Sequence, residues 1–107
     1  MSKRNTIFRV NKQTNYTVIH NSYVKYEKLS WKAKGILTYL LTLPNDWKIN
    51  INDLVKRSTD GINSLRAGIK ELQEAGYIRR YPVKDEKGKI VEWAFDVYET
   101  RVDENPQ

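Results

Sequence analysis

The chain has 107 residues, a length that suits one domain with a core of its own. Its apolar content of 39%, with seven Tyr and three Trp, is typical of a globular protein, and no apolar run approaches the roughly 20 residues of a membrane span. The net charge is +6, and the sequence holds no Cys, which excludes disulfides and thiolate metal sites and is compatible with a cytoplasmic protein.

The positive charge is concentrated in the first part of the chain. Residues 1–91 hold 18 Lys and Arg against 8 Asp and Glu, whereas residues 92–107 hold 1 against 5. A compact surface with this excess attracts polyanions, and nucleic acid is the commonest polyanion inside cells. An acidic membrane or an acidic protein would be attracted for the same reason, so charge alone leaves these alternatives open.

The N-terminal segment is predicted to be a basic flexible arm over residues 1–15, which carry four cations and no acid. It lacks the apolar stretch of a secretory signal. Residues 16–20 (YTVIH) are β-branched and aromatic, which predicts a short strand at the edge of the domain. The single histidine, His20, is expected to make a structural hydrogen bond and to take no part in chemistry.

A first helix is predicted to start after Ser30, whose hydroxyl can cap it, and to end before Pro44. Its apolar face is broad and comprises Ala33, Ile36, Leu37, Leu40 and Leu43. Trp31 is expected to pack in the core or at its edge, and Trp47 to fill the core below the following turn. Gly35 is expected to be a packing contact within the helix.

A second, short helix is predicted over residues 51–58 (INDLVKRS), with Asn50 as its N-cap. Asn50 and Asp53 have the spacing of a capping box. The helix would bury Ile51, Leu54 and Val55. A turn then leads to a longer amphipathic helix, and this succession is that of a helix-turn-helix.

The stretch that organises the chain is residues 60–77, which read as one amphipathic helix. Its apolar positions fall on a single helical stripe, made of Ile62, Leu65, Ile69 and Leu72. Three side chains could cap its N-terminus, namely Ser58, Thr59 and Asp60. Gly76 is expected to end the helix in the left-handed conformation, with Tyr77 beside Leu72.

The opposite face of this helix is small, polar and basic in its first half and acidic towards its end. It carries Asn63, Ser64, Ala67 and Lys70, with Arg66 on its border, followed by Glu71 and Glu74. A helix that enters the DNA major groove reads bases with its N-terminal residues and needs short side chains where it approaches the groove closely. The alternative is an ordinary solvated surface, which this segment alone does not exclude.

After Gly76 the hydrophobic period changes from helical to alternating, which predicts strands over residues 77–83 and 90–99. They are separated by the turn signal KDEKGK, in which Gly88 is available for a positive φ. The apolar face of the second strand is expected to lie on the helices and comprises Val91, Trp93, Phe95 and Val97. The hairpin is basic, with Arg79 and Arg80 on its first strand and Lys84, Lys87 and Lys89 at its tip.

A helix-turn-helix followed by a basic hairpin is the order of a winged helix. The expected fold is therefore α+β over residues 16–99, with about three helices, a C-terminal hairpin wing and the short N-terminal strand. Residues 100–107 (TRVDENPQ) are polar and acidic and are predicted to be a linker or tail. Three features agree: the order of the helices, the change from basic to acidic side chains along the helix of residues 60–77, and the cationic hairpin. Together they indicate DNA binding.

Two stretches, LSWKAKGILTYLLTLPNDWKININDL (29–54) and DGINSLRAGIKELQEAGYIRRYPVKDEKGKIVEWAFDVYE (60–99), resemble the N-terminal winged-helix domain of DnaD-like and plasmid RepA-type replication initiation proteins. Such proteins come from phages and mobile elements of Gram-positive bacteria, and the resemblance covers most of the chain. It implies a DNA-binding or scaffolding module, often dimeric, placed before a linker and a second domain that engages DNA or helicase-loading proteins. Because no second domain follows in this sequence, we expect it to be part of a longer protein.

The resemblance places the recognition helix on residues 59–75 and the wing on residues 79–89. From the helical wheel we expect Asn63, Ser64 and Arg66 to approach base edges, and Lys70 and the wing to contact phosphates. The candidate DNA-binding residues are Thr59, Asn63, Ser64, Arg66, Ala67, Lys70, Arg79, Arg80, Lys84, Lys87 and Lys89. No metal, cofactor or enzymatic activity is expected, because the sequence has one histidine, no cysteine and no Gly-rich phosphate loop.

Two alternatives to a replication initiator stay open. A transcriptional repressor could use the same fold on its own promoter, and the sequence does not separate the two. A protein-interaction or dimerisation scaffold could be built on the aromatic residues Tyr16, Tyr23, Tyr26 and Trp31. Double-stranded DNA is favoured over single strands, because the sequence indicates no aromatic platform on which bases could stack.

Overall fold

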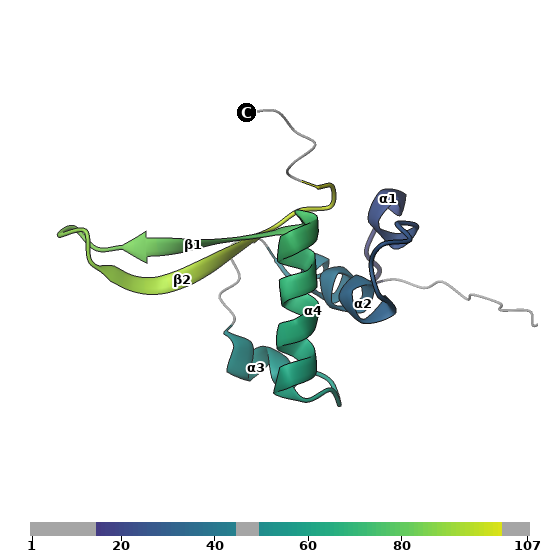
Figure 1. The fold of residues 1–107 in the computed structure, drawn as a ribbon, viewed down its shortest axis with the longest axis horizontal. Helices are drawn as coiled ribbons and strands as arrows, with labels where there is room; N and C mark the ends of the chain where they lie inside the picture. Colours follow the sequence, from purple (N-terminus) through teal and green to yellow (C-terminus); the bar gives the residue numbers. More distant parts are fainter. Residues whose placement is uncertain (1–14, 45–49, 102–107) are drawn as a thin grey trace, which may run out of the picture.

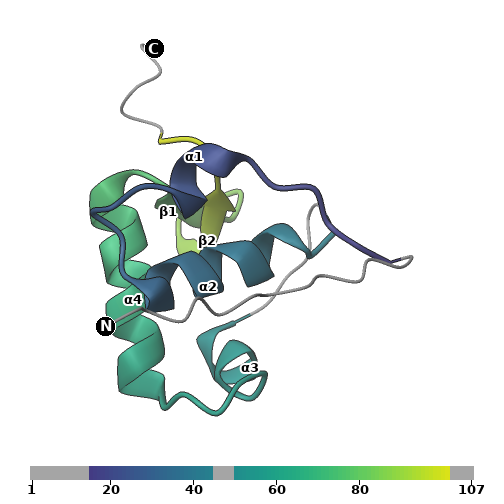
Figure 2. The same cartoon turned by 90° about the vertical axis from the view of Figure 1, so that its right-hand side faces the viewer.

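The computed structural model describes residues 15–44 and 50–101. Its elements are α1 (Asn21–Val24), α2 (Trp31–Leu41), α3 (Ile51–Val55), α4 (Ile62–Ala75), β1 (Ile78–Lys84) and β2 (Ile90–Val97). In Figure 1, α1 and α2 lie to the right of α4, and the hairpin extends to its left. Figure 2 shows α1 above α2 and α3 below it. This arrangement confirms the predicted α+β fold and is consistent with a winged helix.

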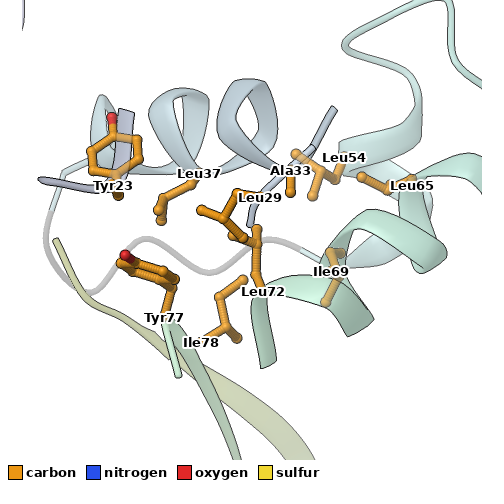
Figure 3. Packing of buried hydrophobic residues seen from close by; sticks show 10 residues of the cluster. All are labelled: Tyr23, Leu29, Ala33, Leu37, Leu54, Leu65, Ile69, Leu72, Tyr77 and Ile78. Carbon is orange, nitrogen blue, oxygen red and sulfur yellow. The ribbon is translucent and has the colours of Figure 1, made fainter. Parts of the chain in front are cut away.

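The core lies between α2, α4 and the start of β1. Its largest fully buried side chains are Tyr23 of α1, Leu37 of α2 and Leu72 of α4. Figure 3 shows the whole buried cluster, which comprises Tyr23, Leu29, Ala33, Leu37, Leu54, Leu65, Ile69, Leu72, Tyr77 and Ile78. Full burial of one large apolar side chain stabilises a fold by about 1.5–3 kcal/mol before entropy is subtracted. Each of the four helices in the described ranges contributes to this cluster, which therefore holds them together.

The body and C-terminus of α4 are as the sequence predicts. Its apolar stripe faces the core, with Ile62 half-buried and Leu65, Ile69 and Leu72 buried. Gly76 follows the helix with a φ of 90°, and its N–H donates to the carbonyl of Gln73. The N–H of Tyr77 donates to the carbonyl of Leu72 over 2.9 Å. These two bonds form a Schellman motif, which confirms the predicted helix end.

The N-terminus of α4 differs from the prediction. Its N-cap is Gly61, and no side chain makes a capping hydrogen bond there, so the expected caps Ser58, Thr59 and Asp60 are wrong. The physical reason is position, because the helix begins one residue later than a cap at Asp60 requires. Ser58 instead accepts a hydrogen bond from the N–H of Asp60 over 3.3 Å, within the turn that precedes the helix.

The start of α2 is capped twice. The Ser30 hydroxyl oxygen accepts a hydrogen bond from the N–H of Ala33 over 3.0 Å, which confirms the predicted cap. The N–H and hydroxyl of Ser30 also donate to the two carboxylate oxygens of Glu71 on α4, over 2.6 and 2.8 Å. The sequence places Glu71 on the solvated face of its helix, and this is wrong, because Glu71 is half-buried against the start of α2.

The close approach of two helices occurs at Gly68 of α4. A Cβ atom at this buried position would overlap Cδ1 of Ile36 on α2 and lie 3.4 Å from Cγ of Lys32. Glycine therefore lets the two helices pack on each other without displacing the Ile36 side chain.

Two predictions for α2 are wrong, and for one reason. Trp31 is 82% exposed, with Nζ of Lys34 lying 4.8 Å from its ring centroid, and Gly35 is exposed with no neighbour within 4 Å of a Cβ. Residues four apart share one side of a helix. This side of α2 faces solvent, because the helix turns Ala33 and Leu37 towards the core.

The predicted N-terminal strand is wrong. Residues 16–20 belong to no strand, and the one sheet in the described ranges is the hairpin of β1 and β2, so no neighbouring strand is there to pair with them. The chain instead enters α1, whose N-cap is His20. Nδ1 of His20 accepts a hydrogen bond from the N–H of Ser22 over 3.1 Å, which confirms the structural role expected for His20. Trp47 and the arm over residues 1–14 lie outside the described residues.

The hairpin matches its predicted strands to within two residues. β1 and β2 pair antiparallel from Ile78 opposite Val97 to Lys84 opposite Ile90, with a register shift between Val83 and Lys84. In the connecting turn Gly88 has a φ of 83°, as the sequence predicts.

Most of β2 does not lie on the helices, which corrects the expectation for its apolar face. Val97 at the base is half-buried, but Phe95 is 36%, Trp93 47% and Val91 59% exposed. The reason is the direction of the hairpin, which projects away from α4 instead of folding back over it (Figure 1). Beyond its base the apolar face therefore remains at the surface.

A cluster of tyrosines closes the end of the core. The ring of Tyr77 meets Tyr23 edge-on, with 6.3 Å between centroids, and lies 6.5 Å from Tyr26. Nη1 of Arg101, in the predicted tail, donates to the hydroxyl of Tyr26 over 2.7 Å, and its guanidinium lies 4.9 Å from that ring's centroid. Tyr23 is buried in the core, and Tyr26 is half-buried and packs against it.

Candidate nucleic-acid interface

The helix-turn-helix consists of α3, the turn of residues 56–61 and α4. Asn50 caps α3 as predicted, with its side-chain oxygen accepting from the N–H of Asp53 over 2.8 Å. In the turn, Nη1 of Arg57 donates to the hydroxyl of Tyr39 on α2 over 2.7 Å. This bond ties the turn to α2, and α3 packs on α4. The first turns of α4 are thereby held in place at the surface.

The face of α4 opposite the core is open to solvent. Four of the predicted contacts are exposed on it, namely Asn63, Arg66, Ala67 and Lys70, and Thr59 is exposed in the preceding turn. Ser64 is half-buried. It lies four residues before Gly68, on the side of α4 that packs against α2, and is therefore less accessible than the sequence indicates.

The two arginines of β1 lie on opposite faces of the hairpin. Arg79 pairs across the strands with Asp96, and Arg80 pairs with Phe95. Successive residues of a strand point to opposite sides of the sheet, and directly opposed residues share a side. The structure therefore separates Arg79, whose cross-strand partner is Asp96, from Arg80, which shares its face with the exposed aromatic residues of β2.

Arg80 and Arg66 come together at an open hollow between α3, α4 and the hairpin. Its volume is about 330 Å³, and its lining comprises Ile51, Arg66, Ile69, Gln73, Arg80 and Phe95. Ile51 and Ile69 are apolar, whereas the two guanidinium groups and the amide of Gln73 are able to form hydrogen bonds with a ligand. The hollow is thus lined by one cation of α4 and one cation of the hairpin.

The tip of the hairpin carries the three predicted lysines, Lys84, Lys87 and Lys89, all exposed. The carboxylate of Asp85 accepts hydrogen bonds from the N–H groups of Lys87 and Lys89, over 2.9 and 3.0 Å. Asp85 therefore shapes the turn, a role that the sequence analysis does not assign to it. Its two bonds hold the backbone that carries two of the lysines.

The aromatic residues of β2 are the part of this surface that the sequence analysis misses. The guanidinium of Arg80 lies over the indole of Trp93, with Cζ 3.9 Å from the ring centroid. Phe95 lies across from Arg80 and lines the hollow. The alternation of apolar residues in β2 is a signal that these rings share a face, but periodicity does not tell whether another element covers that face.

Comparison with protein-family models, with curated proteins and with solved structures finds no match for this chain. The resemblance to DnaD-like and RepA-type initiators therefore stays a prediction. No helix in the two described ranges has both the length and the apolar character needed to cross a membrane. Over the same residues, no three His, Asp or Glu side chains are grouped so that they could hold a metal ion.

Proposed function

We propose that this chain is the DNA-binding winged-helix domain of a replication initiation protein of phage or plasmid type, acting in the cytoplasm. In this proposal α4 enters the major groove of double-stranded DNA and the hairpin contacts phosphates. The observation that carries it is the hollow lined by both Arg66 of α4 and Arg80 of β1. A duplex that meets the recognition helix on this side also meets the wing.

The side chains of α4 suit a close approach to DNA. Asn63 and Ala67 are short and exposed, and Lys70 follows one turn after Arg66. The major groove is about 12 Å wide and admits a helix, whose N-terminal residues then reach base edges. Glu71 does not oppose this docking, because its carboxylate is engaged by Ser30 at the start of α2.

The assignment to replication rests on the resemblance of residues 29–54 and 60–99 to initiator domains. The same resemblance is the basis for a homodimer and for helicase-loading proteins as partners. A repressor that binds its own promoter would use the same surface in the same way. The two readings differ in where the target lies, because an initiator binds its replication origin and a repressor its operator.

The proposal is tested by fluorescence anisotropy with labelled duplexes tiled across the chain's own locus, with a scrambled duplex as control. We expect one tile to bind more tightly than the scrambled duplex, and its position then tells an origin from an operator. The slope of log K against log salt is expected to be about −0.9 for each phosphate contact. An absence of duplex binding even at low salt would refute the proposal.

A second candidate is a protein-interaction scaffold, which one observation favours. Trp31 is 82%, Val18 79% and Tyr16 74% exposed, and large exposed apolar side chains mark interaction surfaces when they gather. Trp31 starts α2, whereas Val18 and Tyr16 lie in the segment before α1, and none of the three belongs to the hairpin. The scaffold would be supported if the molar mass in solution rises with protein concentration. Trp31→Ala should then return the mass to that of the monomer.

A further inference from the structure

We infer that the face of the hairpin that joins the hollow binds unpaired nucleotides, so that this surface holds single-stranded DNA next to the duplex site. The inference rests on the proposed function and extends it. It concerns Trp93 and Phe95, two aromatic residues that sit two apart on one face of β2, and Arg80 of β1, which pairs with Phe95 and whose guanidinium lies over the ring of Trp93. Nothing in the proposed duplex contacts uses these rings.

The aromatic rings are accessible in a way that suits stacking. Trp93 is 47% and Phe95 36% exposed, although both would gain by burial. The guanidinium of Arg80 lies over one face of the Trp93 indole, with Cζ 3.9 Å from the ring centroid, so a base that approaches this face packs on the arginine plane. Aromatic rings and arginine planes are the surfaces on which unstacked bases pack in proteins that bind single strands.

The hollow beside these rings is open to solvent and is lined by both apolar and polar side chains. Its volume of about 330 Å³ is at the lower end of the roughly 300–1,000 Å³ of small-molecule sites. Its lining includes the ring of Phe95, the apolar side chains of Ile51 and Ile69, and Gln73, which can both donate to and accept from a base edge. A paired base is held inside a duplex, so such a site suits a base that has left its partner.

Charge decides between DNA and a second copy of this chain as the occupant. Arg66 and Arg80 line the hollow, and exposed lysines stand at the tip of the same hairpin. In a symmetric dimer the same patch of both copies meets, so this face would bring like charges together. A nucleotide strand instead places a phosphate beside each stacked base, which complements both the cations and the rings.

The test compares three labelled ligands by fluorescence anisotropy at one low salt concentration. They are an oligothymidylate of about twelve nucleotides, an abasic strand of the same length, which keeps the phosphates and lacks the bases, and a duplex. We expect the oligothymidylate to bind at least about fivefold more tightly than the abasic strand, because the rings stack only on bases.

Trp93→Ala is expected to weaken oligothymidylate binding by roughly 5- to 150-fold, the range for loss of one stacked base, and to leave the abasic strand within about twofold. Trp93→Phe, which keeps a ring, should restore most of the affinity. Trp31→Ala removes a more exposed tryptophan, from α2, and should leave the binding of both strands unchanged. Far-UV circular dichroism and thermal melting of each variant check that it is folded.

Equal binding of the oligothymidylate and the abasic strand would overturn the inference, as would equal weakening of both strands by Trp93→Ala. The inference would also be overturned if the protein forms a dimer that Trp93→Ala dissociates, while the binding of the oligothymidylate stays unchanged. The duplex keeps this result apart from the proposed function. If the duplex binds and the bases of the single strand add nothing, the inference fails and the proposed function stands. If the single strand binds through its bases and the duplex does not bind, the proposed function fails, and the assignment of unpaired nucleotides to this face stands.

Discussion

The carboxylate of Glu71 on α4 accepts two hydrogen bonds from Ser30 at the start of α2, one from the backbone N–H over 2.6 Å and one from the hydroxyl over 2.8 Å. It also places a negative charge at the positive end of the α2 dipole. Because Ser30 caps α2 through Ala33, the three groups form one chain of hydrogen bonds. The helix α4 is thus joined to α2 by a polar contact as well as by the core.

Glu71→Ala is expected to lower the free energy of unfolding by about 1–2 kcal/mol, because it removes two charge-assisted hydrogen bonds at a partly exposed site. Urea denaturation measures the change. Glu74→Ala is the matched control, since Glu74 is an exposed glutamate of the same helix. Its effect should stay within about 0.5 kcal/mol. Equal effects of the two substitutions would show that the contact with Ser30 contributes no stability.

Two helical glycines are expected to respond in opposite directions. Gly35→Ala should stabilise the fold by about 0.5–1 kcal/mol, because a Cβ there meets nothing and alanine is the better helix former. Gly68→Leu should destabilise it by about 1–3 kcal/mol, because the added side chain must displace Ile36 of α2. Thermal melting of both variants checks the pair. Destabilisation by Gly35→Ala would mean that this position is not open.

Arg80 and Arg79 are neighbours in the chain, but only Arg80 is expected to matter strongly for duplex binding. Arg80→Ala should cost about 1–2 kcal/mol of binding free energy, the value of a charged hydrogen bond to a phosphate. Arg79→Ala should change affinity by no more than about twofold, because Arg79 lies on the other face, opposite Asp96. Anisotropy at one salt concentration compares them. Equal losses would mean that both faces of the hairpin contact DNA.

Arg66 is expected to supply part of the sequence preference. If its guanidinium makes a bidentate base contact, Arg66→Ala should reduce the difference between the preferred and the scrambled duplex by about 1–3 kcal/mol. The measurement is a pair of titrations, one with each duplex. A loss of the same size on both duplexes would assign Arg66 to a phosphate, since phosphate contacts carry no sequence information.

Lys87 at the tip of the wing is expected to contact phosphate only. Lys87→Ala should weaken binding to all duplexes alike and should reduce the magnitude of the salt slope by about 0.9. Lys25→Ala is the control, because it removes the same charge from the C-cap of α1. An identical change in slope for both variants would indicate that net charge alone, and not a contact by the wing, accounts for the effect.

The features that could be predicted from the sequence are those set by local spacing. The stripe from Leu65 to Leu72 and the left-handed Gly76 each depend on residues within a few positions, and the structure has both. The cap at Ser30 is equally local, and it too is confirmed. These signals were enough to place α4 and to orient its polar face.

The features that could not be predicted depend on which elements meet. Glu71 and Ser30 are 41 positions apart, and nothing in either segment indicates the other. Likewise, alternation in β2 tells that Trp93 and Phe95 share a face, but the direction of the hairpin decides whether helices cover it. For this reason the exposure of Trp93 and Phe95 could not be predicted from the sequence.

Arg101 has a practical consequence for anyone who shortens this protein. Its guanidinium donates to the hydroxyl of Tyr26 over 2.7 Å and lies over the same ring, so it bridges 75 positions of the chain. A version trimmed after Glu99, where the second predicted strand stops, would lose both contacts of Arg101. The Tyr26 edge of the tyrosine cluster would then be uncovered. A cut placed beyond residue 101 keeps it, and a label attached there leaves the lysines at the tip of the hairpin unmodified.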